Sequence, residues 1–455
     1  MIGLNQDDVK KIIETFRNIW SIDDLRRRIL LTLGMILVYR VGSFITLPGI
    51  NPTKLSMGGT QNGLLGLFNM FAGGSFGRAS IFALGIMPYI SASIAMQLLT
   101  IAVPQFAKMQ KEGESGRRKI NQYTRLLTVA VTALQSLAYV SYLRTQAATA
   151  IIPQFGFLFF TVSTVIVLTA GTLFVMWLGE KITDKGIGNG TSIIIEVGIL
   201  ANLPNALWFE FTSKSTSGGG GLLIFLIEIA FLILIIMGLV LLVQGTRKIP
   251  VNYAKRIIGN KQYGGVRQFL PLKVNAAGVM PIIFAQAIMF IPPAFMGFAG
   301  GGKSSSGFMR AFSDYTTVPY NLAFFVLCVV FTYFYTALIF NPTQMADEMK
   351  RNNGFIPGIK PGKATGEYIG AIMDRITLPG AFCLALVGIM PGFAHALNIN
   401  QAFARFFGGT SLLIIVGVIL DTLQQIESQL LMRHYDGLMK TGRIEGRTAG
   451  VASGM

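Results

Sequence analysis

The 455-residue chain is poor in the side chains that usually perform catalysis or bind metals. It has two cysteines, Cys328 and Cys383, and two histidines, His395 and His434, which lie far apart. Both cysteines fall inside apolar stretches, so we expect buried thiols and neither a disulfide framework nor a metal site. The sequence contains no HExxH or GxSxG motif and no paired carboxylates in facing spans. We therefore expect no enzyme activity and no cofactor.

Charge is also scarce. Charged residues make up 13% of the chain and hydrophobic residues 52%, whereas soluble domains carry roughly 25% charged residues. The mean hydropathy is +0.57. This composition predicts an all-α integral membrane protein with many spans. The apolar runs mark ten of them, at 29–47, 79–103, 122–143, 155–178, 190–208, 222–243, 275–298, 318–340, 371–390 and 409–431.

Lysines and arginines are distributed unevenly. When each of the 38 is assigned to a terminus or to the connection next to it, 30 belong to the N-terminal segment, the C-terminal tail and every second connection between spans. The positive-inside rule places these segments, and both termini, in the cytoplasm. Two groups of five spans then begin on opposite sides of the membrane. This arrangement predicts two inverted five-helix halves, a common design in transport proteins.

The same pattern predicts a division of the chain. It comprises a cytoplasmic amphipathic N-terminus (1–28), an N-terminal half (29–210), an outer linker (211–221), a C-terminal half (222–431) and a cytoplasmic tail (432–455). The linker has the Gly/Ser composition of flexible coil. The basic cytoplasmic segments 244–274 and 341–370 are long and mixed in composition, so we expect folded docking surfaces. The second and sixth connections between spans (108–125 and 247–273) interleave basic residues with Tyr, Phe and Pro, so we expect them to recognise a large partner. Attraction to lipid head groups accounts for their charge but not for their length.

The stretch Ser80–Pro104 has no charged residue across 25 positions. Ile86 and Ile90 share one helical face, which turns polar further along. Pro88 is expected inside this helix, where it weakens the helix locally. A short apolar segment, Gly63–Gly74, precedes it and cannot cross a bilayer. These features indicate either a lined and plugged pore or an ordinary packed membrane helix.

Three local patterns indicate no catalytic site. The sequence GFAGGGKS at 297–304 fits the phosphate-loop pattern but lacks the strand and helix that the motif needs, so we expect no direct nucleotide binding. The sequence GIGNG at 186–190 favours a turn and a helix start, with Thr191 or Ser192 near the cap, over an anion nest. Glu228 lies within a span, at a cost of roughly 2.5–3.5 kcal/mol on insertion scales. It faces a wet interior, is protonated or reaches the nearby interface.

Together, several longer motifs closely resemble the bacterial SecY family, the central subunit of the protein-conducting channel. The resemblance runs in matching order from about residue 20 to 435. The motifs are RVGSFITLPGI (40–50), FNMFAGGSFGRASIFALGIMPYISASI (68–94), KEGESGRRKI (111–120), MWLGEKITDKGIGNGTSIII (176–195), VNYAKR (251–256), LPLKVNAAGVMP (270–281), FYTALIFNP (334–342), FIPGIKPGKAT (355–365) and FGGTSLLI (407–414).

The resemblance implies ten helices in two inverted halves, hinged around a central hourglass pore. The implied channel is passive: it passes unfolded secretory polypeptides across the bacterial plasma membrane and releases hydrophobic segments sideways between the second and seventh spans. By motif alignment its apolar ring consists of Ile86, Ile90, Ile195, Ile283 and Ile414. At a sixth position, where the family is usually apolar, this chain has Thr191. The plug (about 63–74) is implied to include Gly63, Leu64, Leu65, Gly66, Leu67, Phe68, Asn69, Met70 and Phe71.

The resemblance also implies partners. They are the SecE and SecG subunits and membrane lipids. The SecA ATPase or the ribosome would supply the energy, and signal peptides and nascent chains would be the cargo. Lys255 and Arg256 match residues that contact SecA and the ribosome. Lys360 stands where the family usually has arginine, which keeps the charge but loses the bidentate fork.

Three other functions remain open. An inverted-repeat secondary transporter for a small solute predicts a compact polar site at the midplane, and the isoleucines expected at mid-depth argue against it. An intramembrane enzyme lacks a catalytic set. The third alternative is a scaffold or insertase without a pore. The ion conductance of a plug-deleted variant separates it from a channel.

Overall fold

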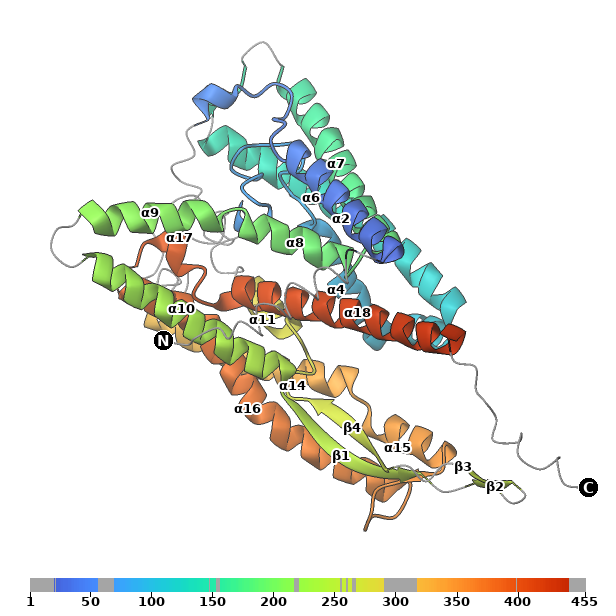
Figure 1. Cartoon of the computed structure of the whole chain (residues 1–455). Helices are drawn as coiled ribbons and strands as arrows, with labels where there is room; N and C mark the ends of the chain where they lie inside the picture. Colours follow the sequence, from blue (N-terminus) through green and yellow to red (C-terminus); the bar gives the residue numbers. More distant parts are fainter. Residues whose placement is uncertain are drawn as a thin grey trace, which may run out of the picture.

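The structure, a computed structural model, describes residues 20, 22–55, 69–146, 148–152, 156–216, 221–253, 256–258, 261–263, 267–289, 317–397 and 399–441. It shows a predominantly helical, multi-pass membrane protein (Figure 1). The α-helices are α2 (Asp23–Gly42), α4 (Met87–Ala102), α5 (Pro104–Lys111), α6 (Glu114–Gln146), α7 (Phe157–Lys185), α8 (Gly190–Leu200), α9 (Leu203–Thr216), α10 (Gly221–Gln244), α11 (Met280–Met289), α14 (Val318–Ile339), α15 (Pro342–Arg351), α16 (Lys363–Ala396), α17 (Gln401–Ala404) and α18 (Gly409–Thr441). The strands are β1 (Thr246–Tyr253), β2 (Arg256–Ile258), β3 (Lys261–Tyr263), β4 (Arg267–Lys273) and β5 (Gly354–Phe355).

Seven helical stretches in the described part of the chain are long and apolar enough to cross a membrane. They are α6, α7, α8 with α9, α10, α14 with α15, α16 and α18. The pair α4 and α5, bent by 101°, gives an eighth if it is counted as one span. Helices α2, α4 and α11 fall on the three other predicted spans. The count of ten spans therefore stays a prediction.

The second predicted span begins differently from our expectation. Helix α4 starts only at Met87, and the residues from Ser80 to Ile86 form a bridge and turns. Pro88 therefore lies in the first turn of α4 rather than inside a helix, at a position where its missing N–H has no helical partner to lose. The prediction of an internal proline break was wrong because the tight turns upstream, with Gly85 at φ +54°, end the preceding segment first.

The linker between the predicted halves is partly helical. Helix α9 continues through Thr216 and α10 begins at Gly221. The flexible coil predicted from 211 onward was therefore wrong for residues 211–216. Lys214, near the end of α9, makes ion pairs that fix this helix end.

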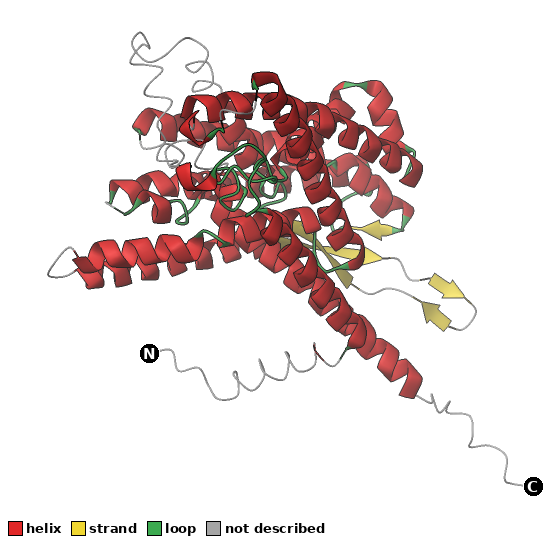
Figure 2. Ribbon diagram, turned by 90° about the horizontal axis from the view of Figure 1, so that it is seen from above, coloured by secondary structure: helices red, strands yellow, loops and turns green. Residues whose placement is uncertain are grey.

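The two basic segments 244–274 and 341–370 fold into one small unit. Strand β1 pairs antiparallel with β4 from its own segment and with β5 from the other, in the order β4-β1-β5. Seen from above, the strands lie at one side of the helices, and the β2–β3 hairpin points away from them (Figure 2). The sheet and the helices α15 and α16 share a separate apolar core, formed by Ile249, Val251, Leu272, Met349, Ile356, Ile369 and Met373. The prediction of folded segments is confirmed here, and the contact between them is new.

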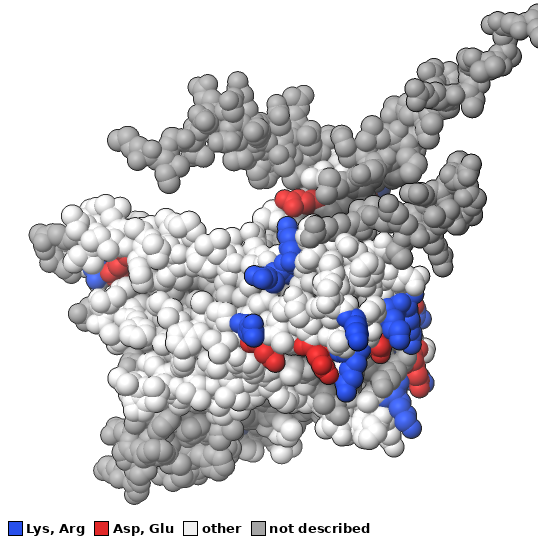
Figure 3. Space-filling model, turned by 90° about the horizontal axis from the view of Figure 1, so that it is seen from below, with Lys and Arg blue, Asp and Glu red and all other residues white. Residues whose placement is uncertain are grey.

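The surface separates charge from apolar side chains. On the face seen in Figure 3, charged residues gather mainly at the right, the side on which Figure 1 places α15 and the sheet. Helix α10 instead exposes leucines and isoleucines along its length, as a lipid-facing helix does. Of the two thiols, Cys328 is buried, as predicted, but Cys383 is exposed, because it lies on an outward face of α16.

Candidate pore and plug

One large buried apolar cluster contains most of the predicted ring. Ile86, Ile195 and Ile414 are buried members, and Ile90 packs against them half-buried. Ile283 is half-buried, whereas its neighbour Ile282 is a fully buried member of the cluster. The chain thus brings together side chains from segments more than 300 residues apart.

These isoleucines all lie close to the beginning of a helix. Ile86 immediately precedes α4, and its carbonyl accepts the N–H of Ile90 at 3.1 Å. Ile195 and Ile414 are each the sixth residue of their helices, α8 and α18, and Ile283 is the fourth of α11. Because these side chains come from the first turns of α4, α8, α11 and α18, they can meet when only the beginnings of the four helices lie near one another.

The GIGNG segment that leads into α8 is an ordered turn. Asn189 is the N-cap residue, and its side-chain oxygen accepts from Thr191 and Ser192. The N–H groups of 187 and 190 donate to threonine hydroxyls, and Gly188 donates to Gln425 of α18 at 2.9 Å. The predicted turn and helix start are confirmed: Asn189 is the cap, and Thr191 and Ser192 lie next to it, as expected. An anion nest is not supported because these donors are used.

Thr191, at the sixth predicted ring position, is hydrogen-bonded to the cap of α8. The Thr191 hydroxyl donates to the Asn189 side chain at 2.6 Å. It therefore strengthens the cap of α8, as a polar side chain at a helix N-terminus does.

The described end of the predicted plug packs into the same cluster as the ring. Met70 and Phe71 are buried members of it. Asn69 holds the turn that follows, because its side-chain oxygen accepts the N–H of Gly77 at 2.7 Å and its carbonyl accepts that of Gly74 at 2.7 Å. Gly63, Leu64, Leu65, Gly66, Leu67 and Phe68 lie outside the described residues.

Helix α8 forms a seat for this plug end. A Cβ at Gly198 would clash with the carbonyl oxygen of Phe71 and would lie 3.3 Å from the backbone nitrogen of Gly73. Only glycine permits this approach of two backbones. Just beyond the helix, the Asn202 amide donates to the carbonyl of Met70 at 3.5 Å. We call Gly198 and Asn202 the plug seat.

Two arginines hold the other side of this segment. Arg78 and Arg40 both donate to the carbonyl of Gly73, at 2.9 and 3.4 Å, and both guanidinium groups lie over the Phe44 ring. Gly73 has φ +64°, a conformation that favours glycine. The sequence analysis did not predict this contact. Arg40 lies inside the first predicted span, however, and a charged residue there indicates a buried polar partner.

Two of the three predicted partner-contact residues lie within the described part of the chain. Arg256 begins β2, while Lys255 lies outside the described residues. Lys360 is exposed in the turn before α16, where its carbonyl accepts the Thr365 hydroxyl at 2.9 Å. Both described positions belong to the segments that carry the small sheet and its flanking turns.

Comparison with known proteins decides the family. A sequence model of the SecY family matches residues 80–423. Two proteins named protein translocase subunit SecY, from Streptomyces scabiei and Halalkalibacterium halodurans, are 43% identical over 441 residues and 45% identical over 439. Each alignment covers 94% of this chain and 100% of the relative. The chain belongs to the SecY family.

Solved structures show that the SecY fold extends over most of the chain. One, described as the structure of a protein conducting channel, has a TM-score of 0.60 at 17% identity and covers 91% of this chain and 95% of the other. A structure concerned with the plug domain of SecY gives 0.59 at 15% identity with the same coverage. Sec61 from a canine ribosome–channel complex gives 0.57 at 15% identity. At these identities the likeness is one of fold.

Proposed function

We propose that this chain is the central, pore-forming subunit of a bacterial protein translocase, a passive channel without enzyme activity. It passes unfolded secretory polypeptides and releases hydrophobic segments into the plasma membrane. Membership of the SecY family supports this function. The observation that carries it in the structure is the packing of Met70 and Phe71 into one cluster with Ile86, Ile195 and Ile414.

The cluster has the properties that such a channel needs. A collar of branched apolar side chains excludes a continuous column of water, as hydrophobic gates do. It offers a passing chain no fixed hydrogen bonds, so many sequences can pass. The described end of the plug adds apolar contact to this collar. Hydrogen bonds from Asn202 and Arg78 position the backbone of this plug end. A secondary transporter would instead need a compact polar site where these apolar side chains meet.

The proposed topology has ten spans in two inverted halves, with both termini in the cytoplasm of the bacterial cell. The first half comprises 29–210 and the second 222–431, joined by the linker 211–221. Charge placement supports this orientation. The five isoleucines form the proposed pore ring, and 63–74 form the plug.

The sheet formed by β1, β4 and β5 is the proposed docking unit for SecA or the ribosome. It joins both basic segments and has its own core, so a partner that binds it meets a rigid surface. Arg256, Lys255 and Lys360 belong to these segments. The fold shared with a channel from a ribosome complex supports the ribosome as one partner. SecE and SecG are the proposed companion subunits.

Ion leakage from vesicles that contain the full chain with its companion subunits tests the pore. Replacing Ile90 and Ile283 with glycine should make these vesicles leaky because two side chains of the apolar seal are removed. The matched control replaces Ile166 of α7 and Ile233 of α10, which are 62% and 58% exposed, so the same helix-weakening change is made outside the cluster. Equal leakage in the two double variants would count against the proposed ring.

A further inference from the structure

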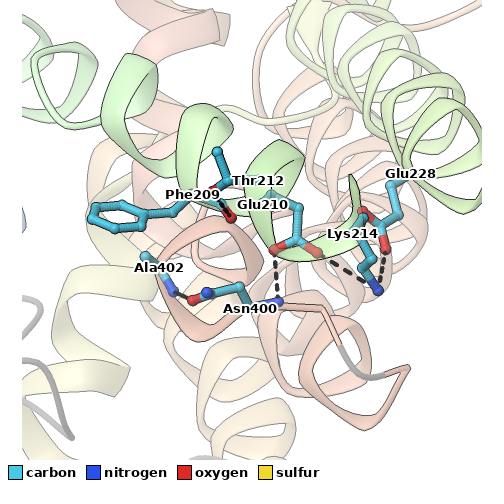
Figure 4. A network of polar contacts seen from close by, with 7 residues as sticks. All are labelled: Phe209, Glu210, Thr212, Lys214, Glu228, Asn400 and Ala402. Atoms are coloured by element: carbon cyan, nitrogen blue, oxygen red, sulfur yellow. Dashed lines mark hydrogen bonds and ion pairs between the residues drawn. The ribbon is translucent and has the colours of Figure 1, made fainter. Parts of the chain in front are cut away.

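A buried cluster of charged side chains lies where α9 meets α10. The Lys214 Nζ lies 3.2 Å from Glu228 Oε1 and 3.6 Å from Glu210 Oε1 (Figure 4). The carboxylate side chains are 6% and 1% exposed, respectively, and that of Lys214 is 15% exposed. The second oxygen of Glu210 accepts the backbone N–H of Asn400 at 3.0 Å. We call these four residues the Lys214 cluster.

The cluster connects three elements that belong to different halves in the proposed topology. Glu210 is the last residue of the first half, and Lys214 follows it in the linker, on the same helix α9. Glu228 is on α10, the first helix of the second half, and Asn400 caps α17, also in the second half. The ion pair and the Asn400 hydrogen bond therefore join the halves at the point where the chain passes from one to the other.

A second polar contact joins the halves at the opposite end of the same arm. Gly188, in the turn before α8, donates to Gln425 of α18 at 2.9 Å. A Cβ at Gly188 would lie close to the Thr422 methyl group, so this approach is tight. The arm formed by α8 and α9 is thus fastened to the second half near both ends.

Lys214 has two partners of different character. Its pair with Glu210 lies within one helix, at a spacing of four residues, and does not involve α10. Its pair with Glu228 crosses to the other half. When α10 moves away, the ammonium group remains paired with Glu210, so the separation does not leave an isolated buried lysine. This arrangement makes the crossing pair easier to release than a lone buried ion pair.

We propose that Lys214 is a releasable charged tether between the two halves, which holds α9 against α10 in the resting state and sets the angle at which the pore closes. The inference rests on the two-half arrangement of the proposed function. Buried ion pairs add little stability compared with apolar residues of similar volume, but they specify one geometry. The tether's role is therefore to select the resting angle.

The distance between the halves tests the tether directly. Spin labels are attached at Ser115, at the start of α6, and at Lys363, at the start of α16, both exposed. The native cysteines are replaced by serine, and the full chain with its companion subunits is studied in vesicles by double electron–electron resonance. We expect Glu228→Gln to shift or broaden the distance distribution and to raise ion leakage by about fivefold, the effect of losing roughly 1 kcal/mol of resting-state preference.

Two further variants separate the tether from general damage. The exchange Lys214→Glu with Glu228→Lys again places one lysine near two carboxylates, so we expect it to return the distribution and the leakage toward wild type. Asp23→Asn removes a carboxylate from an exposed ion pair of α2 and should change neither measurement. If the Glu228→Gln protein does not accumulate, Glu228→Asp is measured in its place. The same changes in distance distribution and leakage are then expected. Wild-type distances and leakage in the Glu228 variant would overturn the proposal, and so would a failure of the exchange to restore them.

The result is distinguishable from a failure of the proposed channel function. The distances are measured in resting protein and need neither SecA nor a translocating chain. A shifted distribution in Glu228→Gln, together with no leakage difference between the ring variants and their controls, would support the tether and refute the pore ring. An unchanged distance distribution in Glu228→Gln, together with ring variants that leak more than their controls, would support the pore ring and refute the tether.

Discussion

Replacing Gly198 by alanine should unseat the plug. The added Cβ would clash with the carbonyl oxygen of Phe71 and crowd the nitrogen of Gly73, which lies 3.3 Å away. Both are backbone atoms, so no side-chain rotation can relieve the contact. Either residues 71–73 move away from α8, or α8 moves away from the ring, and both movements open the apolar cluster.

The size of the effect follows from two opposing terms. Overpacking of a tight contact costs about 1–3 kcal/mol, and this cost applies only while the plug is seated. Alanine also favours a helix over glycine by roughly 0.5–1 kcal/mol, but this gain is the same whether the plug is seated or not. The ratio of closed to open channels should therefore fall by about 5-fold to 150-fold, since every 1.4 kcal/mol is about tenfold.

Ion leakage of reconstituted vesicles measures this ratio. Gly417→Ala in α18 is the matched control, because no atom lies within 4 Å of the position of its Cβ. It makes the same change in a helix that also carries a ring residue and should leave leakage at the wild-type level. If Gly198→Ala vesicles are as tight as Gly417→Ala vesicles, the seat does not hold the plug closed.

Two further predictions concern the plug turn and the docking unit. Asn69→Ala removes the acceptor for the N–H of Gly77, 2.7 Å away, a bond of about 1 kcal/mol; leakage should rise severalfold, whereas Asn69→Asp, which keeps an acceptor, should stay near wild type. Lys360→Glu reverses an exposed charge in the proposed docking unit and should slow SecA-driven translocation in an inverted-vesicle assay while the protein stays inserted. Lys54→Glu, an equally exposed reversal in the 3₁₀ turn after α2, is its control, and equal rates in the two variants would remove Lys360 from the contact surface.

The sequence predicted the helices well because long apolar runs and the placement of basic residues can be read directly from the order of residues along the chain. It also predicted that the basic segments fold, since their aromatic and proline content exceeds what lipid attraction requires. The pairing of β1 with β5 was not predictable, because it joins strands about 100 residues apart that have no shared local signal. The start of α4 was missed because turns formed by Gly85 and its neighbours overrule an uninterrupted apolar run.

The candidate ring came from motif alignment, but the contacts that position the plug did not. Gly198 is one glycine in an apolar helix, and nothing in the sequence shows that the carbonyl of Phe71 approaches it. Glu228 was recognised as costly in a span, yet its partner could not be named. Lys214 lies 14 residues earlier on another helix, and only the packing of α9 against α10 brings the two charges together.

The three kinds of interaction in this chain occupy different places, and in the proposed channel this separation would account for a gate that is tight yet releasable. The seal itself is apolar, so it parts without exposing buried charge and closes again when water is excluded. The plug end is held at its edges by hydrogen bonds from Asn202, Arg40 and Arg78 to backbone carbonyls, each of which water can replace at little net cost. The described charge pairs buried most deeply lie at the α9–α10 corner, where the proposed movement of the halves would break the Lys214–Glu228 pair and leave the Lys214–Glu210 pair within α9. A ring built from ion pairs would close as tightly but would have to desolvate its charges at every closing.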